Sequence, residues 1–398
     1  DSGYIITGTD KSDINNSDVW LIKTDANGNL YSTPSSPLWY VATTGSDATG
    51  DGSEGNPFAT IQTAIDTSSD GDSVLVAAGT YVENINYNGK NISIIGSDRE
   101  TTIIDGDSSG SVVTFDGDDV HSISLSGLTI TNGSNNKGGG IYVVDGLNIE
   151  LSNILISENT VGNTSGRYGG GMYLSSSTGN ISDVIFSDNE AYGGGGLCTE
   201  YSEITLHNVD FTQNNGANHG GGARFDQSTV DIYNSVFSGN YSWYNGAGFY
   251  CEDGDCNLIN VTITQNTTQC NDCMNGRGGA FIQKNANVTV LNSIIWDNFA
   301  SSQVKFEGSD PCSLTINYSN FYGGQEEINW LVSQGGGYLS TDGVLNWGAG
   351  NIDADPLFCS SNSSLSFDGI DDYVQTNLYL NSLPYTITCR FNSFVSSG

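Results

Sequence analysis

A phrase repeated between Leu151 and Asn298 constrains the fold of this chain more than any other feature. The first half of each copy is an apolar residue, two spacers and an asparagine, at 156–159, 186–189, 211–214, 237–240, 263–266 and 295–298. The second half is a glycine cluster followed by apolar residues, at 138–141, 169–172, 194–197, 220–223, 246–249 and 278–280. The asparagines recur every 25 or 26 residues, with steps of 30 and 32 at the two ends of the series. Such a period predicts stacked units, none of which buries its apolar face alone.

Short alternating segments lie between these signatures. In Leu147–Leu151, alternation places Ile149 and Leu151 on one face, and the pairs at 204/206 and 230/232 repeat the arrangement. We therefore predict an all-β solenoid. Coils stacked at strand spacing would number roughly 12 and form a rod about 58 Å long.

Two recurring positions predict the corners of each coil. An asparagine or aspartate stands three residues before the apolar residue of the FxxN phrase, at Asn153, Asp183, Asn208, Asn234, Asn260 and Asn292. Asparagine tolerates the left-handed backbone of a sharp bend, and stacked amides can bond the copies above and below as a structural ladder. The glycine clusters predict a second corner, where the backbone bends without a Cβ atom.

A short helix is expected before the repeats. After Pro57, the apolar residues Ile61, Ala64 and Ile65 stand at helical spacing. An open solenoid end exposes both core and strand edge, so this helix is the expected N-terminal cap. Short β-branched strands broken by Gly and Asn turns continue to Gly106.

The stretch from Tyr40 to Gly106, with its YV, GSD, DGS, TIQ, GTY, ENI and TIIDG phrases, resembles the opening of right-handed parallel β-helix proteins of the pectate-lyase-like superfamily. The later repeats resemble the FxxN and GG[A/L/I] signatures of polymorphic outer-membrane proteins. The segment Asn351–Phe358 resembles the phrase that closes such helices. The resemblance covers about residues 38–358 and implies a right-handed parallel β-helix. Its motifs are scaffold motifs, and no catalytic residues are assigned from them.

Both ends of the chain resemble other domain types. Residues 1–37 carry GYIITG and DVWLIKTDANG, which resemble one propeller-like repeat followed by a linker. Residues 359–398 resemble the first strands of a laminin-G or concanavalin-like jelly roll. The sequence therefore predicts three parts, at 1–37, 38–358 and 359–398, with flanking β-strand segments on either side of the solenoid.

The charge balance limits the classes of molecule that this chain can bind. There are 11 basic and 45 acidic residues, and the formal net charge is −34. That field repels nucleic acid and anionic membranes. No apolar run reaches membrane-spanning length. The chain opens within a strand-like pattern at Tyr4–Thr7, without a signal peptide, and we expect it to be an internal piece of a longer exported protein.

The eight cysteines are consistent with an exported protein. Disulfides are favoured over zinc in a Gly/Asn/Ser-rich exported chain, and local pairing would join Cys251 to Cys256 and Cys270 to Cys273. The zinc alternative uses the same four thiolates as one site.

Three groups of residues are candidates for ligand binding. Lys137, Arg167, His219 and Arg277 each stand in the loop before a glycine cluster, where they would line an acidic-glycan groove or act as solvated charges. The aromatic residues Trp243 and Tyr244 would stack sugars or pack against another subunit. The acidic loop with Asp47, Asp51 and Glu54 is a candidate Ca²⁺ site with hard oxygen ligands, or an ordinary acidic turn.

The leading functional prediction is a non-catalytic structural or adhesive β-helix module of a larger exported bacterial surface protein, outside the cell, assembling as a homo-oligomer or fibre. The alternatives are a polysaccharide lyase, which needs a Lys or Arg base, and a carbohydrate-binding module that recognises a glycan.

Overall fold

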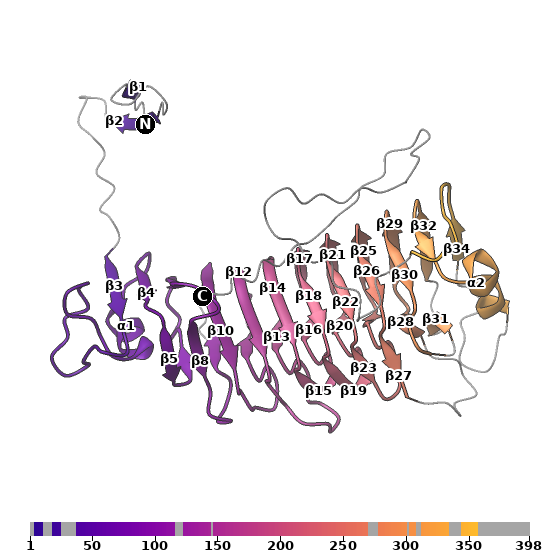
Figure 1. The fold of residues 1–398 in the computed structure, drawn as a ribbon, viewed down its shortest axis with the longest axis horizontal. Helices are drawn as coiled ribbons and strands as arrows, with labels where there is room; N and C mark the ends of the chain where they lie inside the picture. The colour runs from indigo at the N-terminus through magenta and orange to yellow at the C-terminus, as the bar shows by residue number, and fades with distance from the viewer. Residues whose placement is uncertain are drawn as a thin grey trace, which may run out of the picture.

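A computed structural model describes residues 4–10, 18–24, 37–115, 122–144, 146–269, 278–300, 302–307, 312–333 and 344–356. From residue 37 these residues form a right-handed parallel β-helix of about nine complete turns, which confirms the predicted fold class. Figure 1 shows the strands stacked along one long axis. Nearly all pairings are parallel, because each strand bonds to its counterpart one coil away. Among the described strands, the exception is the antiparallel pair β1 (Tyr4–Asp10) and β2 (Asp18–Thr24).

The first sheet of the β-helix is the longest. Its strands follow one another through consecutive parallel pairings: β3 (Leu38–Val41), β4 (Ser73–Val76), β7 (Ser93–Gly96), the first parts of β10 (Ile123–Thr131), β12 (Asn148–Ser157) and β14 (Thr178–Ser187), then β17 (Glu203–His207), β21 (Thr229–Tyr233), β25 (Asp255–Ile259), β29 (Asn287–Leu291), β32 (Ser313–Asn317) and β34 (Val344–Trp347). The estimate of roughly 12 coils matches the levels of this sheet only. Fewer turns are complete, because the other sheets are shorter.

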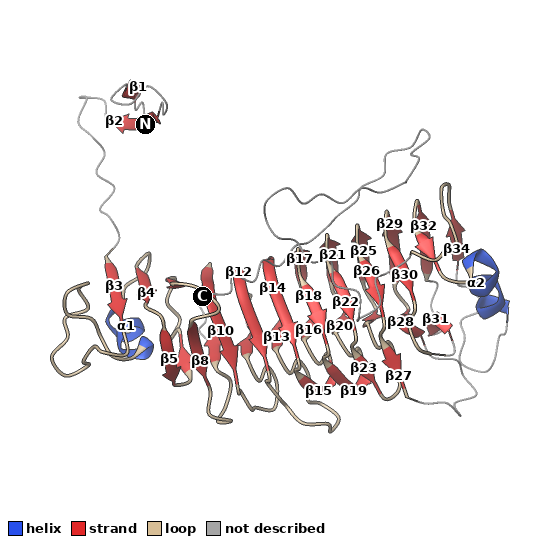
Figure 2. Ribbon diagram, viewed as in Figure 1, coloured by secondary structure: helices blue, strands red, loops and turns tan. Residues whose placement is uncertain are grey.

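The second sheet lies after the first corner of each coil. It contains β5 (Gly79–Val82), β8 (Thr102–Asp105), the second parts of β10, β12 and β14, then β18 (Asp210–Thr212), β22 (Val236–Ser238), β26 (Thr262–Thr264), β30 (Ile294–Trp296) and β33 (Asn320–Phe321). The strands β10, β12 and β14 run through the corner without a break, whereas later coils have separate strands on either side of it (Figure 2).

The third sheet closes each coil. Its nine strands are β6 (Ile85–Asn86), β9 (Val113–Phe115), β11 (Ile141–Val143), β13 (Met172–Ser175), β16 (Leu197–Glu200), β20 (Ala223–Asp226), β24 (Phe249–Glu252), β28 (Gly278–Lys284) and β31 (Ser302–Glu307). A fourth, short sheet lies between the second and third, with β15 (Glu190–Gly193), β19 (Asn215–His219), β23 (Tyr241–Ser242) and β27 (Thr267–Thr268).

Helix α1 (Ile61–Thr67) is the predicted N-terminal cap. Its buried face is Ile61, Ala64 and Ile65, as the spacing indicates, and it packs on β3, β4 and β6. Both ends of α1 receive side-chain partners. The Glu83 carboxylate accepts from the backbone N–H groups of residues 61 and 62 at 2.9 and 3.1 Å, and Lys90 Nζ donates to three carbonyls at the C-terminal end at 2.7–2.8 Å.

A second helix, α2 (Gly324–Ser333), contacts β31 and β34 near the other end of the stack. Its Ile328 is fully buried and its Glu327 accepts a hydrogen bond from the backbone N–H of Gln303 at 3.1 Å. The sequence analysis did not predict α2.

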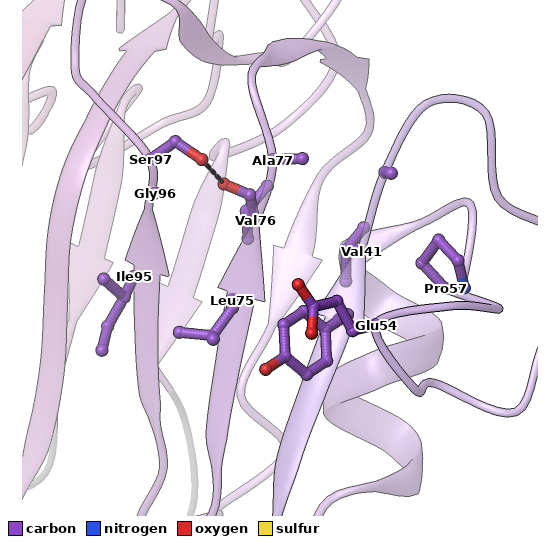
Figure 3. A pocket seen from close by; sticks show the side chains of 11 residues that line it. Val41, Glu54, Pro57, Leu75, Val76, Ala77, Ile95, Gly96 and Ser97 are labelled. Atoms are coloured by element: carbon purple, nitrogen blue, oxygen red, sulfur yellow. Dashed lines mark hydrogen bonds between the residues drawn. The ribbon is translucent and has the colours of Figure 1, made fainter.

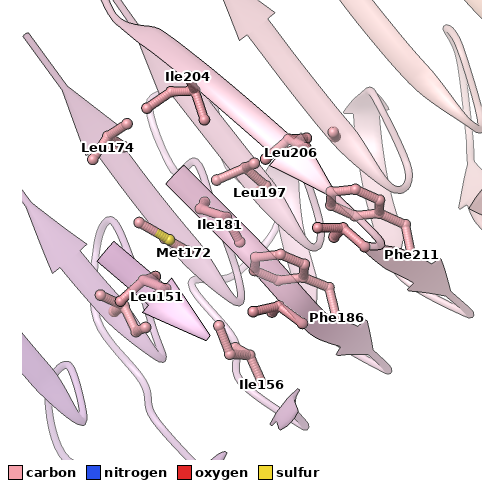
Figure 4. Packing of buried hydrophobic residues seen from close by; sticks show 14 of the residues in the cluster. Leu151, Ile156, Met172, Leu174, Ile181, Phe186, Leu197, Ile204, Leu206 and Phe211 are labelled. Atoms are coloured by element: carbon pink, nitrogen blue, oxygen red, sulfur yellow. The ribbon is translucent and has the colours of Figure 1, made fainter. Parts of the chain in front are cut away.

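The core consists of apolar side chains stacked in files from coil to coil (Figure 4). The apolar residue of the FxxN phrase forms one such file, and its rings stack at centroid separations of 4.9 Å between Phe186 and Phe211 and 4.5 Å between Phe211 and Phe237. Offset stacking adds roughly 0.5–1.5 kcal/mol per aromatic pair beyond burial.

The first corner carries the residues predicted as the structural ladder. Asn153, Asp183, Asn208, Asn234, Asn260 and Asn292 all have positive φ, between 49° and 59°. The amide bonds between them are discontinuous: Asn208 donates to Asp183, and Asn260 Nδ2 donates to Asn234 Oδ1 at 3.1 Å. These bonds lie in exposed or partly buried positions.

A continuous, buried amide ladder stands instead at the asparagine that ends each FxxN phrase. Each Nδ2 donates to the Oδ1 of the next copy at 2.8–3.0 Å, through Asn159, Asn189, Asn214, Asn240, Asn266 and Asn298. Each of these amides also donates to a carbonyl of the preceding coil, and each Oδ1 from Asn189 onward also accepts the preceding asparagine's backbone N–H. The ladder therefore links six consecutive coils through their interior.

The glycine clusters allow neighbouring coils to approach closely. A Cβ atom on Gly171 would lie 2.6 Å from the carbonyl oxygen of Gly196 and 3.1 Å from Asn189 Cγ. We expect Gly171→Ala to destabilise the chain by about 2 kcal/mol, because the backbone of the adjacent coil must shift. The control is Gly55→Ala, where no heavy atom lies within 4 Å of the added Cβ. Equal urea midpoints for the two variants would contradict this packing argument.

Candidate functional site: the charged face of the third sheet

Side chains on the outer side of the third sheet form a charged face. Alternate residues of β13, β16, β20 and β24 point away from the apolar core, and Tyr173, Cys198, Arg224 and Tyr250 occupy one row of register partners. All four are nevertheless buried. The charged face is defined here as these four residues with Lys137, Tyr168, Glu200, Asp226, Glu252, Lys284, Lys305 and Glu307.

Arg224 stands at the centre of the charged face, with a side chain only 8% exposed. Its guanidinium lies 2.7 Å from Asp226, 3.0 Å from Glu252 and 3.6 Å from Glu200, and it packs over the Tyr168 ring at 4.6 Å from the centroid. Burial acts to lower the pKa of Arg224, but Cys198 and the nearby carboxylates outweigh it and the pKa is raised. The guanidinium is therefore held as a cation.

Lys137 reaches the same cluster from an earlier coil. Its Nζ lies 2.6 Å from the Tyr173 hydroxyl and 3.3 Å from Glu200, and 4.1 Å from the Tyr173 ring centroid. The Tyr173 hydroxyl also donates to Glu200. Burial, with the charge of Glu200, raises the pKa of Tyr173. Lys137 thus neutralises a carboxylate of its own chain.

The far end of the face repeats this pairing. Lys284 bonds Glu252, and Lys305 lies 2.5 Å from Glu307. The hydrogen bond that Lys284 donates to Glu252 raises the pKa of Lys284. The pKa of Glu252 is lowered, because Lys284 and Arg224 outweigh the effect of burial. Four cations therefore face four carboxylates, and the charged face as a whole is close to neutral.

His219 lies among aromatic rings beside this face. Its ring centroid is 4.7 Å from that of Tyr250 and 6.2 Å from that of Tyr192, and its two nitrogens contact the side-chain amides of Asn218 and Asn245. Burial, together with the charge of Arg224, lowers the pKa of His219 to about 4. The imidazole is therefore neutral at pH 7.

The three described residues of the predicted basic row have different surroundings. Lys137 joins the charged face and His219 lies beside it, but Arg167 is bonded to Thr164, Asn136 and the carbonyl of Val161. Arg277 lies outside the described residues. The aromatic residues Trp243 and Tyr244 are 48% and 42% exposed on the turn that follows β23.

The acidic loop residues use their carboxylates locally. Asp47 accepts from the backbone N–H groups of Ala59 and Thr60 at 2.8 and 3.1 Å, and Asp51 accepts from the backbone and hydroxyl of Ser53. Backbone and side-chain hydrogen bonds outweigh burial and lower the pKa of Asp47. Within the described residues, no three His, Cys, Asp or Glu side chains cluster as a metal site. The Ca²⁺ assignment of Asp47, Asp51 and Glu54 therefore remains a prediction without a gathered ligand set.

The predicted disulfide between Cys251 and Cys256 is absent. Both are buried free thiols that project into the core from β24 and β25, and Cys198 and Cys312 are free as well. Cys270 and Cys273, and with them the zinc alternative, lie outside the described residues.

The sequence analysis missed Arg224, Glu200, Asp226 and Glu252. A signal was present, since these residues are the charged members of strands that directly follow glycine clusters. Their mutual contacts, however, depend on the register between coils 26 residues apart.

The topology places the described residues in the class of right-handed parallel β-helix proteins. No protein-family model and no curated protein match the chain. Among solved structures, it is similar to a pectin methylesterase variant in complex with a hexasaccharide, with 13% identity, coverage of 78% of this chain and 93% of that chain, and a TM-score of 0.30. It is also similar to pectin methylesterase PemA from Erwinia chrysanthemi, with 13% identity, coverage of 77% of this chain and 92% of that chain, and a TM-score of 0.26. For pectate lyase Pel9A the identity is 16%, the coverage is 72% of this chain and 70% of that chain, and the TM-score is 0.28. These likenesses extend no further than the fold.

Proposed function

We propose that this chain is a non-catalytic structural or adhesive β-helix module of a larger exported bacterial surface protein. The observation that carries the proposal is the pairing of cations on the charged face. A polysaccharide lyase needs a basic group to remove a proton and cations to neutralise a uronate carboxylate. Here Lys137, Arg224 and Lys284 are occupied by carboxylates of the same chain.

The basic groups in and beside the charged face are poorly suited to act as a general base. The raised pKa values of Arg224 and Lys284 make both poor bases, and the imidazole of His219 is surrounded by rings and amides. The interior asparagine ladder supports a structural role, because the most regular feature of the sequence stabilises the stacking of the coils. No helix among the described residues has both the length and the apolar composition to cross a membrane.

The test is a turnover assay on the full chain, with polygalacturonate, methylated pectin and rhamnogalacturonan as substrates. We expect no ultraviolet absorbance from unsaturated sugar ends and no release of methanol, because no described cation of the charged face is free to engage a uronate. Product formed by the wild type and lost in Lys137→Met would overturn the proposal in favour of a lyase.

A carbohydrate-binding role is the second candidate, and the exposure of Trp243 and Tyr244 favours it. Exposed rings provide the flat apolar surface on which sugars stack. A glycan array compares the wild type with Trp243→Ala; loss of every signal in the variant would support this role. Assembly into a homo-oligomer or fibre, and the likeness of the chain ends to propeller and jelly-roll segments, remain predictions about the longer protein.

A further inference from the structure

A groove of about 390 Å³ lies on the outer side of the first sheet, at its N-terminal end (Figure 3). Its floor consists of Tyr40, Leu75 and Ile95, which are register partners on β3, β4 and β7. These side chains alternate with the core residues of the same strands and therefore face solvent. Ile95 is 39% exposed, and together with Tyr40 and Leu75 it forms an apolar patch on the outer side of the sheet.

The groove is confined to the first three levels of the sheet. The next register partners of Ile95 in the row are Ser126 and Ser152, so the apolar floor ends at β10. The loop between β3 and α1 supplies Glu54 and Pro57 at the other margin. This loop is fixed in place, since Tyr40 donates its N–H to Gly52 O at 2.9 Å and accepts from Phe58 N at 2.9 Å.

Glu54 gives the groove its chemical selectivity. Its side chain is exposed and makes no hydrogen bond or ion pair with any other described residue, and none of the lining residues is basic. Every carboxylate of the charged face has a cation, whereas this one has none. A carboxylate beside an aromatic ring attracts an ammonium group through both its charge and the ring quadrupole. The net charge of −34 increases the local concentration of cations further.

We infer that this groove binds a basic, aliphatic peptide segment of a partner protein. A lysine or arginine side chain would place its cation at Glu54 and lay its methylene groups on Tyr40, and a neighbouring branched residue would contact Leu75 and Ile95. Three levels at strand spacing cover about 10 Å, which suits two or three residues. The volume lies within the range of sites that bind small ligands.

The experiment uses the full chain and isothermal titration calorimetry with N-acetyl-Leu-Lys-Leu-amide, its Leu-Gln-Leu analogue and methyl β-glucopyranoside. We expect the lysine peptide to bind at least about threefold more tightly than the glutamine peptide, as for a partly exposed ion pair. Glu54→Gln should remove that difference and leave the glutamine peptide unchanged. Leu75→Ser should weaken both peptides.

The matched control is Glu203→Gln, an exposed glutamate on β17 of the same sheet, which should alter nothing. Circular dichroism of each variant verifies that the fold is retained. Four results would overturn the inference: no binding of the lysine peptide, equal affinities for the two peptides, an equal loss in Glu203→Gln, or tighter binding of the glycoside than of either peptide.

Discussion

Asn240→Leu is expected to destabilise the β-helix by about 4 kcal/mol, because four side-chain hydrogen bonds in the buried ladder disappear together. Asn240 Nδ2 donates to Asn266 Oδ1 and Phe211 O, and its Oδ1 accepts both the backbone N–H and the side-chain amide of Asn214. Leucine has the same number of side-chain heavy atoms and the same branching but no polar atoms. It therefore removes the acceptor of the backbone N–H and the side-chain amide of Asn214, and the side-chain donor to the carbonyl of Phe211.

Urea denaturation followed by circular dichroism measures the loss. Hydrogen exchange then locates it, because a solenoid transmits instability mainly to neighbouring coils. The control is Asn234→Gly at the first corner, where glycine keeps the positive φ of 51° and only partly exposed bonds to His207 and Asn260 are lost. We expect this control to cost less than about 1 kcal/mol. A control as damaging as Asn240→Leu would show that the ladder has no special role.

The position of the ladder illustrates what the sequence could predict. Both asparagine series recur with the same period, and alternation from Phe237 would point the third residue after it, Asn240, away from the core. The residue immediately before each asparagine reverses that parity, because its backbone is left-handed. Gly239 has a φ of 66°, and its counterparts have φ between 54° and 58°: Glu158, Asp188, Gln213, Gln265 and Asp297. A left-handed residue turns the following asparagine inward. The period predicts the coils, but this local backbone state decides which asparagines are buried.

The charged face illustrates a different limit. The place of Lys137 before a glycine cluster predicts either a groove residue or a solvated charge, and neither reading includes a carboxylate partner. Its carboxylate partner Glu200 is 63 residues away, and only the stacking of coils brings the two within 3.3 Å. A residue's row can be assigned from one repeat, whereas its electrostatic partner depends on the register of several.

Arg224→Met is expected to cost about 3–5 kcal/mol at pH 7, the range found when one partner of a buried ion pair is removed. Methionine preserves much of the side-chain volume over the Tyr168 ring. It leaves Glu200, Asp226 and Glu252 close together, with Lys137 and Lys284 as the remaining cations. The control is Arg99→Met, which removes an ion pair with the exposed Glu100 and a 3.3 Å hydrogen bond to the Asp183 carbonyl, and should cost below about 1 kcal/mol.

The cost of Arg224→Met should depend on pH, and the sign follows from the carboxylates. Lys284 and Arg224 lower the pKa of Glu252, so its ionised form stabilises the fold above its unfolded pKa, and this contribution is lost as the pH falls through the lower, folded value. Burial raises the pKa of Asp226 even with Arg224 present. Without Arg224 both pKa values rise, and protonation relieves the repulsion in the variant.

The difference in urea midpoint between wild type and Arg224→Met should therefore be largest near pH 7 and shrink towards about pH 4, where carboxylates take up protons. The Arg99→Met difference should stay small throughout, because its partner is solvent-exposed. A constant deficit for Arg224→Met from pH 7 to pH 4 would mean that lost packing against Tyr168, rather than unpaired charge, causes the instability. In that case the pairing of cations on the charged face would no longer explain why they are unavailable to an acidic glycan.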